Sequence, residues 1–274
     1  LAAGKGVIVC QNKEEALSAL DKIMKDRAFG EAGDEIVIEE FLEGREVSVL
    51  AFCDGKTIRL MVPVCDHKRV FDNDEGPNTG GMGAYSPPKF YTKELGKQIL
   101  NKIFLPTLTA LKKEGIKYKG VLYGGLIITK EGPKVLEFNC RFGDPETQVI
   151  LPKLKNDLVE ILEAVVDEEL DEIDINWDPQ FCITVVLASG GYPGKYETGE
   201  EIKGLDEVDS DIVVFHAGTK SESDEILTSG GRVLNVTTLG KDVQSARKKV
   251  YENIKKIKFK NMHYRKDIGN KENF

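Results

Sequence analysis

The sequence EFNCRFGDPETQ occupies residues 137–148 and directly follows a predicted strand at residues 133–136. Because side chains two residues apart on a strand point to the same face, we expect Glu137 and Asn139 to lie side by side. Their carboxylate and amide oxygens are hard ligands of the kind that suits Mg²⁺. Arg141, two residues further on, continues the pattern and is placed to hold an anion. The stretch predicts a metal and an anion at one strand end, and an ordinary strand end followed by a turn is the alternative.

Length and composition limit the class of protein. The chain has 274 residues, 41% hydrophobic residues and a net charge of −8. No stretch reaches the roughly 20 apolar residues of a membrane helix, and the acidic balance argues against nucleic acid as a partner. Five scattered cysteines without a Cys-x-x-Cys motif, and no signal peptide, predict a cytoplasmic protein. The chain lacks an initiator Met and begins like the middle of a loop, so we expect a piece of a longer protein.

Hydrophobic patterning divides the chain into three parts and predicts an α+β protein. In the first part, residues 1–44, we expect a strand at 7–10, a helix that Asn12 and Glu15 cap together, and a strand at 35–42. This strand–helix–strand unit is expected to form one small lobe.

The second part, residues 45–172, is expected to be the main lobe. Two hairpins are predicted at 46–60 and 120–139, whereas residues 72–88 are rich in Gly, Pro, Asn and Asp and predict a long loop. The predicted helices run from Thr92 to Lys113 with a division at Pro106, and onward from a cap at Asn156 or Asp157. The third part, residues 173–274, is expected to be β-rich, with strands at 181–187, 212–215 and 232–236 and a final helix from Asp242.

Four further segments carry charges or glycines that suit a nucleotide. Lys5 lies between two glycines, which let a backbone approach a phosphate. Residues 39–42 form a connection whose backbone groups can face an adenine edge, and Glu46 can accept from ribose hydroxyls. The charged residues 66–69 lead into the glycine-rich residues 76–85, a pattern typical of a loop over phosphate or substrate. A bare turn, a strand end and a solvated charge run are the respective alternatives.

Together these segments resemble the ATP-grasp superfamily and, within it, the phosphoribosylamine–glycine ligase family, also called glycinamide ribonucleotide synthetases. The motifs that carry the resemblance are LAAGKGVIV (1–9), IEEFLEG (38–44), DHKR (66–69), GPNTGGMGAYSP (76–87), EFNCRFGDPETQ (137–148), FHAGT (215–219), GGRV (230–233) and YRKDIG (264–269). The resemblance implies an ATP-grasp fold with a small α/β lobe (1–44), a larger antiparallel-sheet lobe (45–172) and a small β-rich C-terminal domain (173–274).

The resemblance also implies a reaction. It joins glycine to 5-phosphoribosylamine in purine biosynthesis, through glycyl phosphate, while ATP becomes ADP and phosphate. We therefore expect these small molecules and Mg²⁺ or Mn²⁺ as partners, no nucleic acid, no membrane, and a monomer or weak dimer. The implied residue roles are an adenine hinge at Glu39, Glu40, Phe41 and Leu42, a ribose contact at Glu46, nucleotide-side or substrate-side contacts at Arg69 and Asn78, metal ligands at Glu137 and Asn139, and catalytic cations at Lys5 and Arg141.

Two departures from the family pattern shape these expectations. The family's N-terminal domain, and a strand with another nucleotide-contacting lysine, would precede the LAAGKG motif and are missing from the sequence. A nucleotide-binding module without catalysis is therefore the alternative function, and a carboxylate kinase that stops at the acyl phosphate is a third. The strand beside Glu137 reads YGGL at residues 123–126, without an acid, so water and phosphate oxygens are expected to complete the metal shell.

Overall fold

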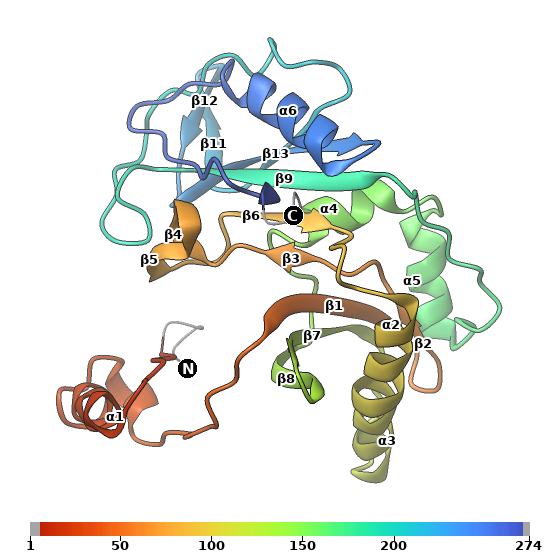
Figure 1. The fold of residues 1–274 in the computed structure, drawn as a ribbon. Helices are drawn as coiled ribbons and strands as arrows, with labels where there is room; N and C mark the ends of the chain where they lie inside the picture. The colour runs from red at the N-terminus through yellow and green to blue at the C-terminus, as the bar shows by residue number, and fades with distance from the viewer. Residues whose placement is uncertain (1–5, 271–274) are drawn as a thin grey trace. The chain divides into compact units, whose positions relative to one another are not determined.

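The computed structural model describes residues 6–270 of the chain (Figure 1). Contacts between residues divide the chain into two units, one ending at Arg45 and the other beginning at Glu46. The break falls one residue after the predicted end of the small lobe.

The first unit is built around α1 (Lys13–Leu20). The Asn12 side chain accepts a hydrogen bond from the Glu15 N–H at 2.9 Å, and the Glu15 carboxylate accepts from the Gln11 N–H at 2.9 Å, which confirms the predicted capping pair. A π-helical turn (Asp21–Lys25) and a 3₁₀ turn (Gly30–Gly33) follow. No residue of α1 is buried, so the apolar stripe predicted for this helix gains little burial.

The strands predicted at 7–10 and 35–42 are wrong. Residues 6–10 and 36–43 have no regular secondary structure, and Val37 and Ile38 are 85% and 80% exposed. A strand exists only when a neighbouring strand takes its backbone hydrogen bonds, and the described residues of this unit form no such ladder. The β-branched pattern is therefore present without the pairing that would turn it into a sheet.

The second unit contains a four-stranded sheet in the order β2-β1-β7-β8. Its strands are β1 (Arg45–Cys53), β2 (Ile58–Leu60), β7 (Gly120–Thr129) and β8 (Gly132–Asn139). Ala51 faces Leu60 across the antiparallel β1–β2 pair, and Gly125 faces Glu137 across the antiparallel β7–β8 pair. Both predicted hairpins are confirmed.

One face of this sheet is covered by two helices in succession (Figure 1). The helical segments are α2 (Lys93–Ile99), a π-helical turn (Leu100–Phe104) and α3 (Leu105–Lys113). The Thr92 hydroxyl caps α2 by accepting from the Leu95 N–H at 3.1 Å. Pro106 lies in the first turn of α3, where the helix needs no N–H from it, so the predicted division of the helix is confirmed.

A second, five-stranded sheet has the order β10-β13-β9-β6-β3. Its strands are β3 (Cys65–Asp66), β6 (Gly83–Ser86), β9 (Phe181–Ala188), β10 (Val213–His216) and β13 (Arg232–Gly240). The strands predicted at 181–187, 212–215 and 232–236 are thereby confirmed.

The long loop predicted at 72–88 is wrong. This stretch contains a 3₁₀ turn (Asp72–Asp74), most of the hairpin of β4 (Arg69–Phe71) and β5 (Glu75–Asn78), and all of β6. Gly83 has φ +154°, and a Cβ there would lie 2.7 Å from the Thr184 carbonyl oxygen. Glycine at this position lets β6 lie against β9, so here it indicates a tightly packed strand and not a loop.

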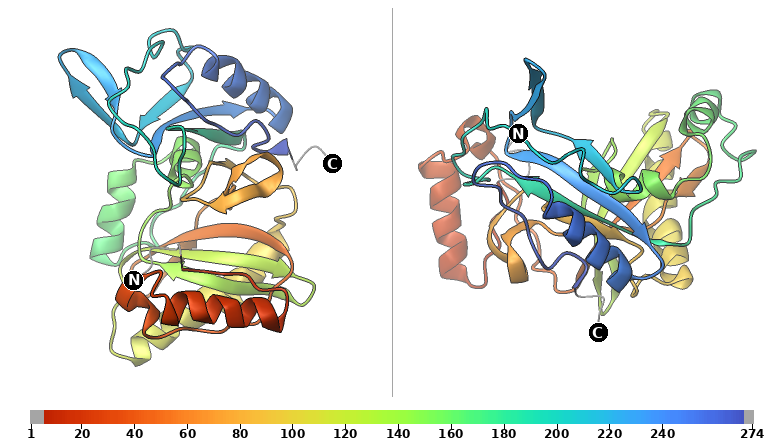
Figure 2. Two further views of the ribbon diagram at one scale, coloured as in Figure 1. Left: turned by 90° about the vertical axis from the view of Figure 1, so that its left-hand side faces the viewer. Right: turned by 90° about the horizontal axis from the view of Figure 1, so that it is seen from above.

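The remaining elements complete the second unit. They are α4 (Thr147–Ile150), α5 (Leu158–Asp167), β11 (Thr219–Glu222), β12 (Glu225–Thr228) and α6 (Val243–Ile254). Asp157 caps α5 and Asp242 caps α6, as predicted. Helix α6 covers the outer face of the second sheet (Figures 1 and 2). The inner face contributes Ala84 and Cys182 to the core that Leu50 and Phe52 of the first sheet share.

The second sheet combines strands from both predicted parts of the chain. Its members β3 and β6 come from the expected main lobe, and β9, β10 and β13 come from the expected C-terminal domain. The division into three domains therefore stays a prediction. Within residues 6–270, no helix has both the length and the apolar character needed to span a bilayer.

Candidate functional site

Polar side chains gather on one face of the four-stranded sheet. Glu46 and Ser48 are two residues apart on β1, and Glu137 and Asn139 are two residues apart on β8. Tyr123 on β7 lies directly opposite Asn139 in the register. Alternate residues of a strand share a face, so three neighbouring strands present acids, an amide and hydroxyls together.

The predicted metal ligands are adjacent on β8. The Asn139 amide donates from Nδ2 to Glu137 Oε1 at 3.2 Å, which confirms that the two side chains share a face. Gly125 lies opposite Glu137, where a Cβ would come within 3.1 Å of Glu137 Cγ, so glycine leaves the carboxylate its space. The donor set is one carboxylate and one amide, and residues 6–270 hold no cluster of three or more acidic, His or Cys side chains of metal-binding geometry. These residues fit a hard cation that keeps several water or phosphate ligands.

Glu146 is the buried acid of this site, with 4% of its surface exposed. Its Oε1 accepts from the Tyr123 hydroxyl at 2.8 Å and from the Ser48 hydroxyl at 3.0 Å, and these two hydroxyls are 2.8 Å apart. Burial, and then the charge of Glu146, raise the pKa of the Tyr123 hydroxyl. Because Glu146 belongs to the turn after β8, its bonds to Tyr123 on β7 and Ser48 on β1 fix that turn onto the sheet.

Lys68 is the central cation of the polar face. Its Nζ lies 2.7 Å from Glu46 Oε2. Burial by itself would lower the pKa of Lys68, but the charges of Asp66 and Glu46, the bond to Glu46 and the charge of Glu137 outweigh it and raise that pKa. The lysine is thus held protonated between the β1 and β8 acids. Sequence analysis identified Lys68 only as part of a charge run, because Glu46 and Glu137 lie on strands far from it in the chain.

Asp66 lies next to this cation. Burial first, and then the negative charge of Glu146, raise the pKa of Asp66 to about 7, against the opposing effect of Lys68. A carboxyl group whose proton is lost near neutral pH is typical of functional sites, although ion-pair networks also produce it. Sequence analysis identified Asp66 only as part of the charged residues 66–69, because Glu146, which raises its pKa, lies far along the chain.

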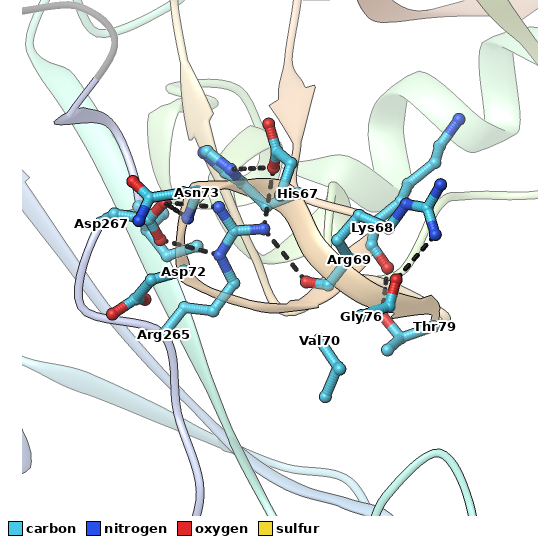
Figure 3. Close-up of polar contacts among 12 residues, drawn as sticks. His67, Lys68, Arg69, Val70, Asp72, Asn73, Gly76, Thr79, Arg265 and Asp267 are labelled. Atoms are coloured by element: carbon cyan, nitrogen blue, oxygen red, sulfur yellow. Dashed lines mark hydrogen bonds and ion pairs between the residues drawn. The ribbon is translucent and has the colours of Figure 1, made fainter.

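The cations Arg69 and Arg141 are exposed. Arg69 faces Asn78 across the β4–β5 hairpin and donates to the Gly76 carbonyl at 2.7 Å. Arg141 donates to the Phe142 carbonyl at 2.9 Å. Each guanidinium group donates to a nearby backbone oxygen, and both side chains are exposed to solvent. Figure 3 shows the Lys68 and Arg69 side chains on the right, extending away from the Arg265 cluster on the left.

That cluster anchors the hairpin from the C-terminal side. Arg265 is fully buried and donates to both carboxylate oxygens of Asp267, at 2.8 and 2.6 Å. Its third nitrogen donates to the Arg69 carbonyl at 3.0 Å and to Asp74 at 2.9 Å (Figure 3). His67 extends the cluster, with Nδ1 3.7 Å from the same Asp74 oxygen. The YRKDIG motif thereby positions residues 67–74 and, through them, the cations of the polar face.

The nucleotide-binding segment predicted in the first unit is an extended connection. Glu39, Glu40, Phe41 and Leu42 lie in the extended segment without regular secondary structure, and Phe41 is 54% exposed. Lys5 lies outside the described residues. The roles given to these residues stay predictions.

Two family profiles match the sequence. The profile described as "Phosphoribosylglycinamide synthetase, ATP-grasp (A) domain" matches residues 1–147, and the one described as "Phosphoribosylglycinamide synthetase, C domain" matches residues 182–271. The fold is therefore that of an ATP-grasp protein. The chain belongs to the phosphoribosylglycinamide synthetase family, which confirms the resemblance carried by its motifs.

Relatives of known name agree. The phosphoribosylamine–glycine ligase of Halalkalibacterium halodurans is 53% identical over 272 residues, covering 99% of this chain and 63% of that protein. The trifunctional purine biosynthetic protein adenosine-3 of Gallus gallus is 54% identical over 271 residues, covering 98% of this chain and 27% of that protein. The chain thus spans about 63% of the length of the curated ligases that it matches.

Solved structures agree as well. The phosphoribosylamine–glycine ligase of Thermotoga maritima has a TM-score of 0.86 and 35% identity, covering 98% of this chain and 66% of that one. The biotin carboxylase domain of the Hydrogenobacter thermophilus 2-oxoglutarate carboxylase, solved with MgADP and bicarbonate, has a TM-score of 0.68 over 95% of this chain and 56% of that one, at 15% identity. At that identity the second likeness shows the fold alone.

Proposed function

We propose that the protein is an ATP-dependent ligase that joins glycine to 5-phosphoribosylamine. The observation that carries the proposal is the polar face of the first sheet, where Lys68 pairs with Glu46 on β1 and Asn139 bonds Glu137 on β8. Membership of the family, and relatives named phosphoribosylamine–glycine ligase at about half identity, support it. Glu137 and Asn139 offer oxygen ligands for a metal ion, and Lys68 offers a positive charge for a phosphate. Phosphoryl transfer from ATP requires both.

In the proposed reaction the substrates repel each other. The glycine carboxylate attacks the γ-phosphorus of ATP, the bond to the β–γ bridging oxygen breaks, and ADP leaves. The amine of phosphoribosylamine then attacks the acyl carbon, the bond to the phosphate oxygen breaks, and phosphate leaves as the amine loses a proton. Enzymes accelerate phosphoryl transfer mainly by positioning and charge stabilisation, so neutralising these anions is the main task of the protein.

The residues of this chain divide that task. Glu137 and Asn139 would hold Mg²⁺ or Mn²⁺, which when bound supplies Lewis-acid stabilisation of phosphate oxygens. Lys68 and Arg69 place positive charge on the β1–β4 side of the face, and Arg141 places it beyond the end of β8. We assign Arg69 and Arg141 to the phosphate and the anionic intermediate, because both side chains are exposed to solvent and available to a ligand.

We assign adenine binding to the extended segment near the end of the first unit. We assign the backbone of Glu39, Glu40, Phe41 and Leu42 to the adenine edge, with Lys5 at the phosphates. We assign Glu46 and Asn78 to the nucleotide or substrate. Because Glu46 is already paired with Lys68, its proposed contact to a ribose hydroxyl would use the carboxylate oxygen that Lys68 leaves open.

Counting products separates this proposal from its alternatives. ADP release and amide formation are measured for the protein at its full natural length, with ATP and Mg²⁺, first with glycine alone and then with glycine and phosphoribosylamine. A ligase forms amide and one ADP per amide only when both substrates are present. ADP release with glycine alone, without any amide when the amine is added, would instead identify a carboxylate kinase. Nucleotide binding without ADP release would identify a binding module.

A further inference from the structure

Arg232 joins two loops of the site from the opposite sheet. It is the first residue of β13 and lies in the GGRV motif, which the proposed reaction leaves without a role. One of its terminal nitrogens donates to the Gly80 carbonyl at 2.8 Å and to the Asp144 carbonyl at 2.9 Å. The other donates to the Asp144 carboxylate at 2.8 Å. The glycine-rich loop and the turn after β8 are thereby bonded to one guanidinium group.

The Asp144 carboxylate is fully committed to this arrangement. One oxygen accepts from Arg232, and the other accepts from the Gln148 side chain at 3.0 Å. The ion pair by itself is worth little, because 48% of the Asp144 side chain is exposed. The importance of Arg232 therefore lies in the geometry of its planar fork, which reaches the Gly80, Gly81 and Asp144 carbonyls and the Asp144 carboxylate together.

The glycines of the loop are shaped for this contact. A Cβ at Gly80 would lie 2.9 Å from the Arg232 guanidinium carbon, and a Cβ at Gly81, where φ is +114°, would collide with the Pro145 ring. The Gly80 N–H also donates to the Tyr192 hydroxyl at 3.0 Å. Both peptide groups of Gly80 are thus bonded to residues that follow β9, and the loop has no freedom to add a side chain there.

The turn that Arg232 holds carries two groups of the polar face. Glu146, which accepts from Tyr123 and Ser48, follows Asp144 by two residues, and Arg141 precedes it by three. The glycine-rich loop, in turn, continues directly from Asn78. The bonds of Arg232 therefore tie the loop that follows Asn78 to the turn that carries Glu146 and Arg141.

We propose that Arg232 is a positioning residue that holds the glycine-rich loop between β5 and β6, residues 79–82, against the Asp144 turn and so keeps water from the acyl phosphate. This inference rests on the proposed ligase function. If water attacks the acyl carbon of glycyl phosphate in place of the amine, the acyl–oxygen bond breaks in the same way, and glycine and phosphate are released. ATP is then consumed without amide formation, so a loosened loop uncouples the reaction.

The ratio of ADP released to amide formed tests the inference in the protein at its full natural length. In the wild type one ADP accompanies each amide. We expect the ratio to rise severalfold in Arg232→Gln and less in Arg232→Lys, and added guanidinium to lower it again in Arg232→Ala. The ratio does not depend on how much protein is folded, because unfolded protein makes neither product. Arg59→Gln is the matched control, since Arg59 donates to the Asp171 carbonyl at 3.1 Å beside β2, and its ratio should stay at that of the wild type.

The outcomes separate the two proposals. An unchanged ratio in Arg232→Gln, with both products slowed equally, would show a purely structural role and overturn the inference while the ligase function stands. If Arg232→Gln does not fold, an unchanged ratio in Arg232→Lys overturns it equally. A wild type that forms no amide refutes the proposed function, and the inference fails with it.

Discussion

The end of β8 and the Arg265 cluster are both rich in charge, but they use it in opposite ways. In the cluster the guanidinium is fully buried, and all three of its nitrogens donate within the protein, to Asp267, Asp74 and the Arg69 carbonyl. At the end of β8, exposed Glu137 accepts a hydrogen bond from Asn139, and exposed Arg141 donates to the neighbouring Phe142 carbonyl. Charges that are satisfied internally build the scaffold, and charges left facing outward are available to a ligand.

This difference predicts that the two regions respond differently to substitution. Changes in the cluster should reduce the free energy of unfolding. Changes at the end of β8 should reduce turnover and leave that free energy almost unchanged, because few internal contacts are lost there.

The largest effect is expected for Arg265→Met, which leaves Asp267 and Asp74 without their cation. Removing one partner of a buried ion pair costs about 3–5 kcal/mol, and urea denaturation measures the loss. Arg59→Met, at a half-buried arginine that donates to the Asp171 carbonyl, should cost no more than about 1 kcal/mol. A loss below about 1 kcal/mol for Arg265→Met would show that the cluster is not a structural anchor.

Glu137→Ala should lower turnover by about 10²-fold or more, as the loss of an electrostatic stabiliser typically does. Its unfolding free energy should stay within about 0.5 kcal/mol of the wild type, because the residue is exposed. Steady-state kinetics at saturating Mg²⁺ and denaturation of the same preparation provide the two numbers. Near-normal turnover would remove Glu137 from the metal site.

Arg141→Lys, also at the end of β8, should have a smaller effect on catalysis than Glu137→Ala. The charge is kept, but a point charge does not replace the planar fork. Losing one charge-assisted hydrogen bond, worth about 1.5 kcal/mol, predicts a decrease in kcat/KM of about tenfold. Unchanged kcat/KM would mean that Arg141 acts through its charge alone or does not contact the intermediate.

The last prediction concerns a pH dependence at Asp66. Burial and Glu146 raise the pKa of Asp66 to about 7 in the folded state, from an ordinary value of 3.8. Between these values the folded protein holds a proton that the unfolded chain has lost, so the contribution of Asp66 to stability falls as pH rises and levels off above about 7. Asp66→Asn should therefore stabilise the protein more at pH 8 than at pH 5. An equal change at both pH values, measured by denaturation without ligands, would contradict the raised pKa.

The sequence predicted the parts of the site that depend on local spacing. Glu137 and Asn139 share a face because strand periodicity places them there, and Gly125 lies opposite. The bonds of Glu146 to Ser48 and Tyr123, the pairing of Lys68 with Glu46, and the reach of Arg232 to Gly80 and Asp144 come from segments far apart in the chain. Spacing along one segment carries no information about such contacts.

The errors in the fold have related causes. The β-branched patterns at 7–10 and 35–42 predicted strands. A strand also needs a neighbouring strand to bond its backbone groups, and the side-chain pattern does not show whether that neighbour is present. Gly83 suggested a loop, whereas tertiary packing against Thr184 makes glycine necessary inside β6. In both cases the neighbouring segment decides the local structure.

Diffraction from crystals of the full-length protein grown with ADP and Mn²⁺ tests the central claim most directly. The anomalous signal locates the ion without reference to any assumed ligand. The account predicts Mn²⁺ within coordination distance of a Glu137 carboxylate oxygen and the Asn139 amide oxygen, and in contact with a phosphate of ADP. An ion bound to the nucleotide elsewhere, with Glu137 and Asn139 making no contact to it, would contradict the account.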